Sequence, residues 1–126
     1  MGKSTSSYIN FVKEQLAPIP NLKSSRLFGG IGFSDGAVQF AMIIENTLYF
    51  VVNDRTRTKY ENMGSHCFAY NTKKGKVEVK RYYSVPADIL EDQDELSALA
   101  TESIKIAHDK KPASPKPAMK KVKVKP

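Results

Sequence analysis

Apolar and polar residues alternate through the segment from residue 26 to residue 54, as they do along strands of a sheet. Two turn signals, Asp35-Gly36 and Glu45-Asn46, divide this segment into three apolar runs. Aspartate followed by glycine is a strong hairpin signal because glycine adopts a positive φ without steric cost. The pattern therefore predicts a three-stranded antiparallel meander, with strands at about 26–33, 38–45 and 48–52.

The second and third of these strands each have an apolar face. On the third strand it is formed by Leu48, Phe50 and Val52. On the second strand one face holds Val38, Phe40, Met42 and Ile44, and the other holds Gln39, Ala41, Ile43 and Glu45. This pattern favours a sheet that is covered on one side. We expect the two strands to be antiparallel neighbours, with Phe40 and Phe50 both buried.

Helical spacing predicts a first helix behind the N-cap candidates at 4–7, ended by Pro18 and Pro20. Its apolar stripe consists of Tyr8, Phe11, Val12 and Leu16, with Gln15 on the same face and Ile9 beside it. A second helix is expected to begin at Asn53 or Asp54 and to run to about residue 63, followed by Gly64. The first helix is predicted to be a packing element.

The remaining pattern predicts two more strands and a last helix. The strands are expected at 67–72 and 77–85, separated by a turn and ended by Pro86. Asp92 and Glu95 resemble a capping box at the start of the helix. Its inner face is expected to hold Leu96, Leu99, Ala100, Ser103, Ile104 and Ala107. The order α-β-β-β-α-β-β-α predicts an α+β fold in which helices pack on an antiparallel sheet.

Charge divides the chain of 126 residues into two parts. Residues 1–109 hold 13 Lys and Arg and 13 Asp and Glu, whereas residues 110–126 hold seven lysines and no acid. We predict one folded domain at 1–109 and a disordered tail at 110–126, because the tail has too few apolar residues to form a core. Its lysines are candidates for contact with nucleic-acid phosphates: Lys110, Lys111, Lys116, Lys120, Lys121, Lys123 and Lys125. An inert, solubilising extension is an equal alternative.

Neither a disulfide nor a membrane segment is predicted. Cys67 is the single cysteine, which suits a reducing compartment. The N-terminal residues lack the apolar region of a secretory signal, and no apolar run approaches the ~20 residues that span a bilayer. We therefore expect a cytoplasmic protein.

Residues with catalytic or ligand-binding chemistry are few. His66 and Cys67 are neighbours that point to opposite sides of a strand, and with His108 they give no zinc-ligand spacing. The segment Gly29-Gly30-Ile31-Gly32 is followed by a hairpin instead of a helix, so a bulge or close backbone approach is a better interpretation than a phosphate loop. We predict no enzyme activity, no cofactor and no metal site.

Three charged or aromatic groups have ordinary structural interpretations. Acids that precede the last helix interact favourably with its dipole. Of the adjacent Tyr82 and Tyr83, one is expected in the core and the other partly exposed. Basic residues between 55 and 81 are diluted by Glu61 and Glu78. The acidic group is Asp88, Glu91, Asp92, Asp94 and Glu95, and the basic group is Arg55, Arg57, Lys59, Lys73, Lys74, Lys76, Lys80 and Arg81.

The order of several short motifs resembles the N-terminal domain of the TfoX (Sxy) family of competence regulators, over roughly residues 16–107. These motifs are Leu27-Phe28-Gly29-Gly30-x-Gly32-Phe33, Asp35-Gly36, Phe40-Ala41, Leu48-Tyr49-Phe50 with Val52-Asn53-Asp54, Tyr82-Tyr83 and Val85-Pro86. The resemblance implies a two-layer α+β domain and a link to control of DNA-uptake genes. It supplies no catalytic motif.

The resemblance also implies a kind of partner. Full-length members of the family are understood to act through a transcription activator of the cyclic-AMP-receptor type, and they carry a second, helical domain where this chain has its lysine tail. We therefore expect a regulatory protein that acts through a protein partner. The alternatives are nonspecific nucleic-acid binding through the tail and, second, a small-ligand sensor or an unrecognised enzyme.

Overall fold

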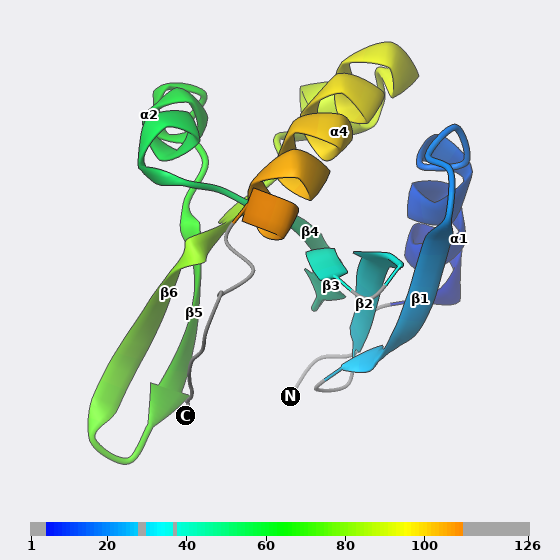
Figure 1. Ribbon diagram of the computed structural model, residues 1–126. Coiled ribbons are helices and arrows are strands. Elements are labelled where there is room, and N and C mark those ends of the chain that lie inside the picture. The colour runs from blue at the N-terminus through cyan, green and yellow to red at the C-terminus, as the bar shows by residue number, and fades with distance from the viewer. Residues whose placement is uncertain (1–4, 28–29, 37, 110–126) are drawn as a thin grey trace.

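In the described part of the chain, the fold consists of an antiparallel sheet of six strands, together with four helices (Figure 1). The computed structural model describes residues 5–27, 30–36 and 38–109. The elements are α1 (Ser6–Gln15), β1 (Leu22–Leu27), β2 (Gly30–Asp35), β3 (Val38–Ile44), β4 (Thr47–Val51), α2 (Asp54–Asn62), β5 (Cys67–Thr72), β6 (Gly75–Ser84), α3 (Ala87–Leu90) and α4 (Gln93–Asp109). The strands lie in the order β1-β2-β3-β4-β6-β5. The predicted α+β class is confirmed.

The first predicted strand, at 26–33, is in fact two strands, β1 and β2, which pair antiparallel. β1 was missed because it is an edge strand whose side chains from Lys23 to Arg26 are exposed. Its place in the sheet depends on main-chain pairing with β2, which leaves no apolar alternation in the sequence. The short helix α3 is also an addition to the predicted order.

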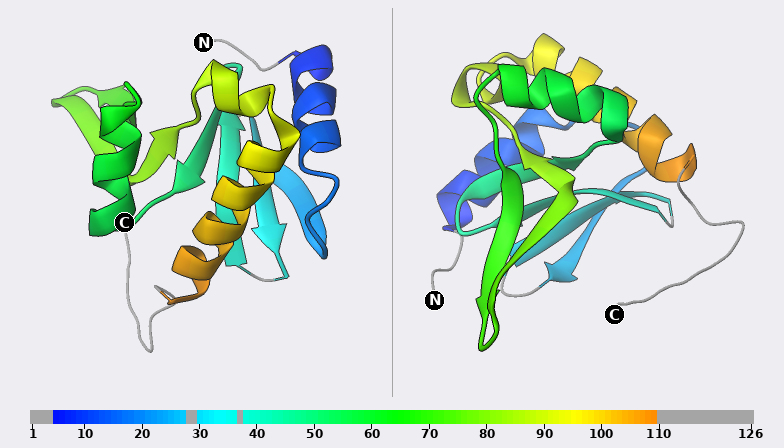
Figure 2. Two further views of the ribbon diagram at one scale, coloured as in Figure 1. Left: turned by 90° about the horizontal axis from the view of Figure 1, so that it is seen from above. Right: turned by 90° about the vertical axis from the view of Figure 1, so that its left-hand side faces the viewer.

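The centre of the sheet is formed by β3 and β4, which are antiparallel neighbours as predicted. Phe40 and Phe50 both have an exposed fraction of 0%, and their ring centroids lie 6.1 Å apart. Viewed from above, α4 crosses the strands, with α2 and α1 to either side of it (Figure 2). The Ser103 hydroxyl of α4 donates a hydrogen bond to the Val51 carbonyl at 2.9 Å, which ties the helix to the sheet.

The predicted division of β3 into two faces needs one correction. Phe40 has no partner in β2, because Ala41 pairs with Phe33 and Gln39 pairs with Ser34. This β-bulge interrupts the alternation of side chains, so Phe40 joins Ala41 and Ile43 in the core beneath the helices.

The predicted helix caps are present. The Asn53 side chain accepts hydrogen bonds from the N–H groups of Arg55 and Thr56, and the Thr56 hydroxyl accepts one from the Asn53 N–H, which completes a capping box. Gly64 follows the helix with a φ of 85°. At the start of α4, Asp92 Oδ1 accepts a hydrogen bond from the Glu95 N–H at 3.2 Å, but the Asp92 N–H donates to the Ile89 carbonyl, so only half of the expected capping box is present.

The strands β5 and β6 form a hairpin that extends away from the rest of the sheet (Figures 1 and 2). β6 pairs with β4 only through residues 82–84, and its residues 75–79 pair with β5 alone. The register shift between Cys67 and Phe68 marks the place where the hairpin leaves the sheet. We call residues 68–80 the arm.

Two further predictions concern the tail and a membrane-spanning segment. The lysine-rich segment 110–126 lies outside the described residues, so its disorder and the domain boundary at 109 stay predictions. Among the described helices, none is long and apolar enough to cross a membrane.

Candidate functional site

The histidines and the cysteine singled out in the sequence are not assembled into a catalytic group. His108 Nε2 lies 3.0 Å from Asp35 Oδ2, where it joins the end of α4 to β2. His66 is exposed and its ring meets Tyr49 edge-on at 6.4 Å. Within the described part of the chain, no group of three or more His, Cys, Asp or Glu side chains is arranged to hold a metal ion.

The glycine-rich segment provides close packing. Gly30 opens β2, and a Cβ at this position would collide with the carbonyl oxygen of Ile43 on β3. The predicted close backbone approach is therefore confirmed at Gly30. Gly29 lies outside the described residues.

The two adjacent tyrosines occupy different environments, as predicted. Tyr83 is buried, and its hydroxyl donates a hydrogen bond of 2.6 Å to Glu61 Oε2. This bond, together with burial, raises the pKa of Tyr83 to about 12. Tyr82 is half-buried, and its hydroxyl accepts a hydrogen bond of 2.9 Å from the Gln39 amide. Both hydroxyls thus have structural partners.

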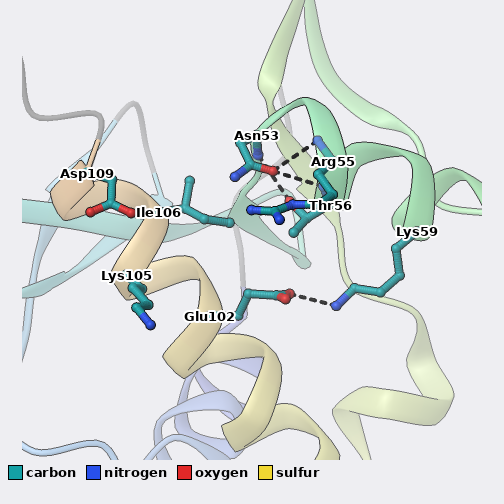
Figure 3. Close-up of a pocket in the computed structure, with 8 residues that line it drawn as sticks. All are labelled: Asn53, Arg55, Thr56, Lys59, Glu102, Lys105, Ile106 and Asp109. Carbon is teal, nitrogen blue, oxygen red and sulfur yellow. Dashed lines mark hydrogen bonds and ion pairs between the residues drawn. The ribbon is translucent and has the colours of Figure 1, made fainter.

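The first candidate site is a cleft of about 570 Å³ between α2 and α4 (Figure 3). Across it, Lys59 of α2 forms an ion pair of 2.7 Å with Glu102 of α4. The lining residues are Asn53, Arg55, Thr56, Lys59, Glu102, Lys105, Ile106 and Asp109. The N–H groups of Arg55 and Thr56 at the start of α2 are already taken by the Asn53 side chain, so these two are not available to an anion. The cleft therefore offers mixed charges but no arranged reactive group.

The second candidate site is a larger cleft of about 730 Å³ between the arm and the β3–β4 turn. We call it the β5 cleft. One wall is the β3–β4 end of the sheet and the other is β5. The lining residues are Ile44, Glu45, Thr47, Tyr49, Phe68, Ala69, Tyr70 and Asn71. Two sheet segments far apart in the sequence thus enclose a mainly apolar groove.

A row of aromatic rings runs along the β5 cleft. The ring centroids of Tyr49 and Phe68 lie 5.4 Å apart in an edge-to-face arrangement, and those of Phe68 and Tyr70 lie 6.0 Å apart. Tyr49 is buried, whereas Tyr70 is 48% exposed. The row therefore leads from the body of the sheet onto a solvent-exposed part of the arm. Large exposed aromatic side chains of this kind are enriched in interaction surfaces.

The far end of the arm is basic. Lys73 and Lys74 form its turn, and neither has an ion-pair partner among the described residues. Lys76 Nζ lies 3.9 Å from Glu78 Oε2, and Lys80 Nζ lies 4.0 Å from Glu78 Oε1. With four lysines against one glutamate, the arm is the basic part of a body whose charges balance between residues 1 and 109. The sequence had suggested no distinction between this segment and the other basic residues.

Sequence reasoning did not identify the β5 cleft. Its walls come from residues 44–49 and 68–71, and the pairing of β4 with β6 brings them together. The candidate lysines of the tail, Lys110 to Lys125, lie outside the described residues and are placed at neither cleft.

A protein-family model, the TfoX N-terminal domain, matches residues 14–107 of this chain. The matched range includes all six strands, every lining residue of the β5 cleft, and every lining residue of the α2–α4 cleft except Asp109. No curated protein is similar enough to this chain to count as a match.

Proposed function

The chain belongs to the TfoX N-terminal domain family, and from this membership we propose that it is a non-enzymatic regulatory protein that acts by binding a protein partner in transcriptional control. The proposed partner is a transcription activator of the cyclic-AMP-receptor type, as the resemblance to competence regulators implies. The proposed location is the cytoplasm. Competence genes are the proposed targets.

The observation that carries this proposal, besides family membership, is the β5 cleft with its aromatic row. Tyr70 is 48% exposed beside a groove of about 730 Å³, on a hairpin that extends from the sheet. An exposed apolar groove next to charged side chains is typical of a surface that binds another macromolecule. His66 lies against Tyr49 and His108 against Asp35, and neither contact is with a nucleophile, which supports a binding function over nucleophilic catalysis.

The test combines binding with a cellular readout. The purified full-length chain is titrated with the purified cyclic-AMP-receptor-type activator from the same cell, and transcripts are compared between cells with and without the gene. We expect saturable binding and altered transcript levels for genes that this activator controls. No binding together with unchanged transcripts would contradict the proposal.

A second proposed function is nonspecific binding of DNA, which the charge of the tail supports. Residues 110–126 hold seven lysines and no acid, whereas the charges of residues 1–109 cancel. If all seven lysines engage phosphates, the logarithm of affinity should fall against the logarithm of salt with a slope of roughly −6. A chain ending at residue 109 should lose nearly all affinity for two unrelated duplexes. Equal affinity of the two forms would place DNA binding in the folded domain instead.

A third proposed function, as a small-ligand sensor or an unrecognised enzyme, has weaker support. The α2–α4 cleft is the natural place for a small ligand, but two of its charged residues, Lys59 and Glu102, neutralise each other across it. Its polar cap residues are likewise engaged with one another.

A further inference from the structure

The two edges of the sheet differ in how they are protected. β1, with the sequence LKSSRL, carries Lys23 and Arg26, whereas β5, with the sequence CFAYNT, carries no charged residue. Charged side chains on an edge strand oppose the addition of another strand, because pairing would bring them against the new chain. β5 lacks this protection, so its outer edge is the better template for an added strand.

The β5 cleft runs along this edge. Four consecutive residues of β5, Phe68 to Asn71, line the cleft. Neighbouring side chains in a strand point to opposite faces, so a cleft that touches all four follows the backbone itself. The lining of the cleft thus includes residues from both faces of β5, as expected for a space that reaches the outer edge of the strand.

The register of the hairpin shows which main-chain groups point to the open edge. Thr72 pairs with Gly75 across the turn, Tyr70 with Val77, and Phe68 with Val79. In an antiparallel ladder, residues alternate between those bonded to the partner strand and those that point away from it. In a two-residue hairpin the pair that closes the turn is a hydrogen-bonded pair, so we expect the N–H and C=O groups of Ala69 and Asn71 to point away from β6.

The side chains around this edge specify the chemistry of the added strand. Phe68 and Tyr70 would contact alternate, apolar residues of an extended segment. Lys73 and Lys74, which have no ion-pair partner among the described residues, would lie beside its end and attract acids there. Glu45, on the opposite wall of the cleft, would repel a chain that is acidic along its whole length.

We propose that the partner binds by adding an extended peptide segment to β5, a segment with apolar residues at alternate positions and acidic residues at the end beside Lys73 and Lys74. This inference rests on the proposed function, since it specifies how the regulatory partner docks. About six residues would pair with β5, over roughly 20 Å. Main-chain hydrogen bonds supply affinity, and the aromatic row and the lysines supply selectivity.

Charge argues against three other occupants of this cleft. A second copy of the chain would present another basic arm, with four lysines against one glutamate. The segment 110–126 would add seven more lysines to the same place. A single-stranded nucleic acid would stack on the aromatic rings, but its phosphates would meet Glu45 on the cleft wall.

The experiment uses the full-length, isotope-labelled chain and two synthetic peptides of about nine residues. Each peptide alternates valine and threonine through a segment matched to the length of β5 and carries glutamates at one end, the N-terminus in one and the C-terminus in the other. We expect one of them to shift the amide resonances of residues 66–72 and 44–49. Whether the peptide that binds carries its glutamates at the N-terminus or at the C-terminus shows whether the added strand is antiparallel or parallel to β5.

Main-chain pairing is tested on both sides of the interface. Asn71→Pro removes an N–H group from the open edge, whereas Asn71→Thr keeps it. We expect the proline variant to bind at least about tenfold more weakly than the threonine variant, with both chains folded as judged by dispersed spectra. A peptide methylated on alternate backbone nitrogens should lose affinity in the same way. Equal binding by the methylated peptide overturns strand addition.

Charge is tested separately. The double variant Lys73→Glu with Lys74→Glu should bind the acid-ended peptide more weakly than the unmodified chain does. It should bind a matched peptide that ends in lysines more tightly. Tighter binding of a single-stranded oligonucleotide at the same residues would overturn the proposal in favour of nucleic acid. Absence of any peptide-induced shift at about 1 mM would overturn it as well.

The outcomes also separate this inference from the proposed function. If Asn71→Pro binds the purified activator and regulates transcription as the unmodified chain does, the proposed function stands and docking of the partner on β5 is wrong. If the peptides bind as expected but the unmodified chain neither binds the activator nor changes transcript levels, strand addition at β5 stands and the proposed function is wrong.

Discussion

The helix-covered centre of the sheet and the arm are built from the same antiparallel pairing, yet they differ in what stabilises them. Phe40 and Phe50 in the centre are fully buried beneath α4. In the arm, the Phe68–Val79 and Tyr70–Val77 pairs are only half-buried or exposed. The centre is fixed by packing, whereas the arm keeps apolar surface available. If the proposed function holds, folding and binding use separate parts of one sheet.

Among the substitutions that test this comparison, the largest loss of stability is expected in the centre of the sheet. Phe50→Ala removes a ring that contacts Phe40 and leaves a cavity beneath α4. We expect the free energy of unfolding to fall by about 3–5 kcal/mol, measured by chemical denaturation. A loss below about 1 kcal/mol would show that this part of the sheet is not close-packed.

The next effect concerns the close approach of β2 to β3. Gly30→Ala places a methyl group against the Ile43 carbonyl, which is backbone and cannot rotate away. We expect a loss of about 1–3 kcal/mol in the free energy of unfolding. Ser24→Ala, an exposed position on β1, is the matched control and should change stability by less than about 0.5 kcal/mol. Equal effects of the two changes would rule out the steric explanation.

A smaller effect is expected at high pH. The pKa of Tyr83 is raised to about 12 in the folded state, chiefly because its hydroxyl donates to Glu61. Below pH 10 both the folded and unfolded states keep this proton, so the stabilisation is complete. Between pH 10 and 12 the unfolded state releases the proton that the folded state retains, and the free energy of unfolding falls.

Tyr83→Phe tests this linkage. It should cost about 1–2 kcal/mol at pH 7 by removing the hydrogen bond to Glu61, and the difference from the unmodified chain should shrink as pH rises from 10 to 12. Burial also raises the pKa of Tyr60, so the variant should still lose some stability at alkaline pH. A pH-independent difference would show that the 2.6 Å bond does not control the titration.

The sequence predicted the elements that packing stabilises. The alternation around Phe50 and the Asn53 cap correspond to β4 and α2, because burial and capping each leave a residue pattern. β1 shows no such residue pattern, because its residues from Lys23 to Arg26 are exposed and its extended conformation depends on pairing with β2.

The candidate site was harder to predict than the fold. The β5 cleft depends on the contact of Tyr49 with Phe68, two residues whose proximity follows from the strand order β4-β6-β5. A single sequence does not encode that order in a readable way. The available signal was an uncharged strand, residues 67–72, followed at once by the lysine-rich turn.

The smallest expected effect on stability is at the exposed end of the arm. Tyr70→Ala removes a side chain that is 48% exposed and whose ring contact is with Phe68 alone among the described residues. We expect the free energy of unfolding to change by about 0.5 kcal/mol or less, against several for Phe50→Ala. The same change should weaken binding of the acid-ended peptide, because Tyr70 lines the β5 cleft. Denaturation and peptide titration of the one variant therefore separate the two roles. A stability loss of about 2 kcal/mol or more would mean that Tyr70 is buried in solution, and that the arm belongs to the packed part of the sheet after all.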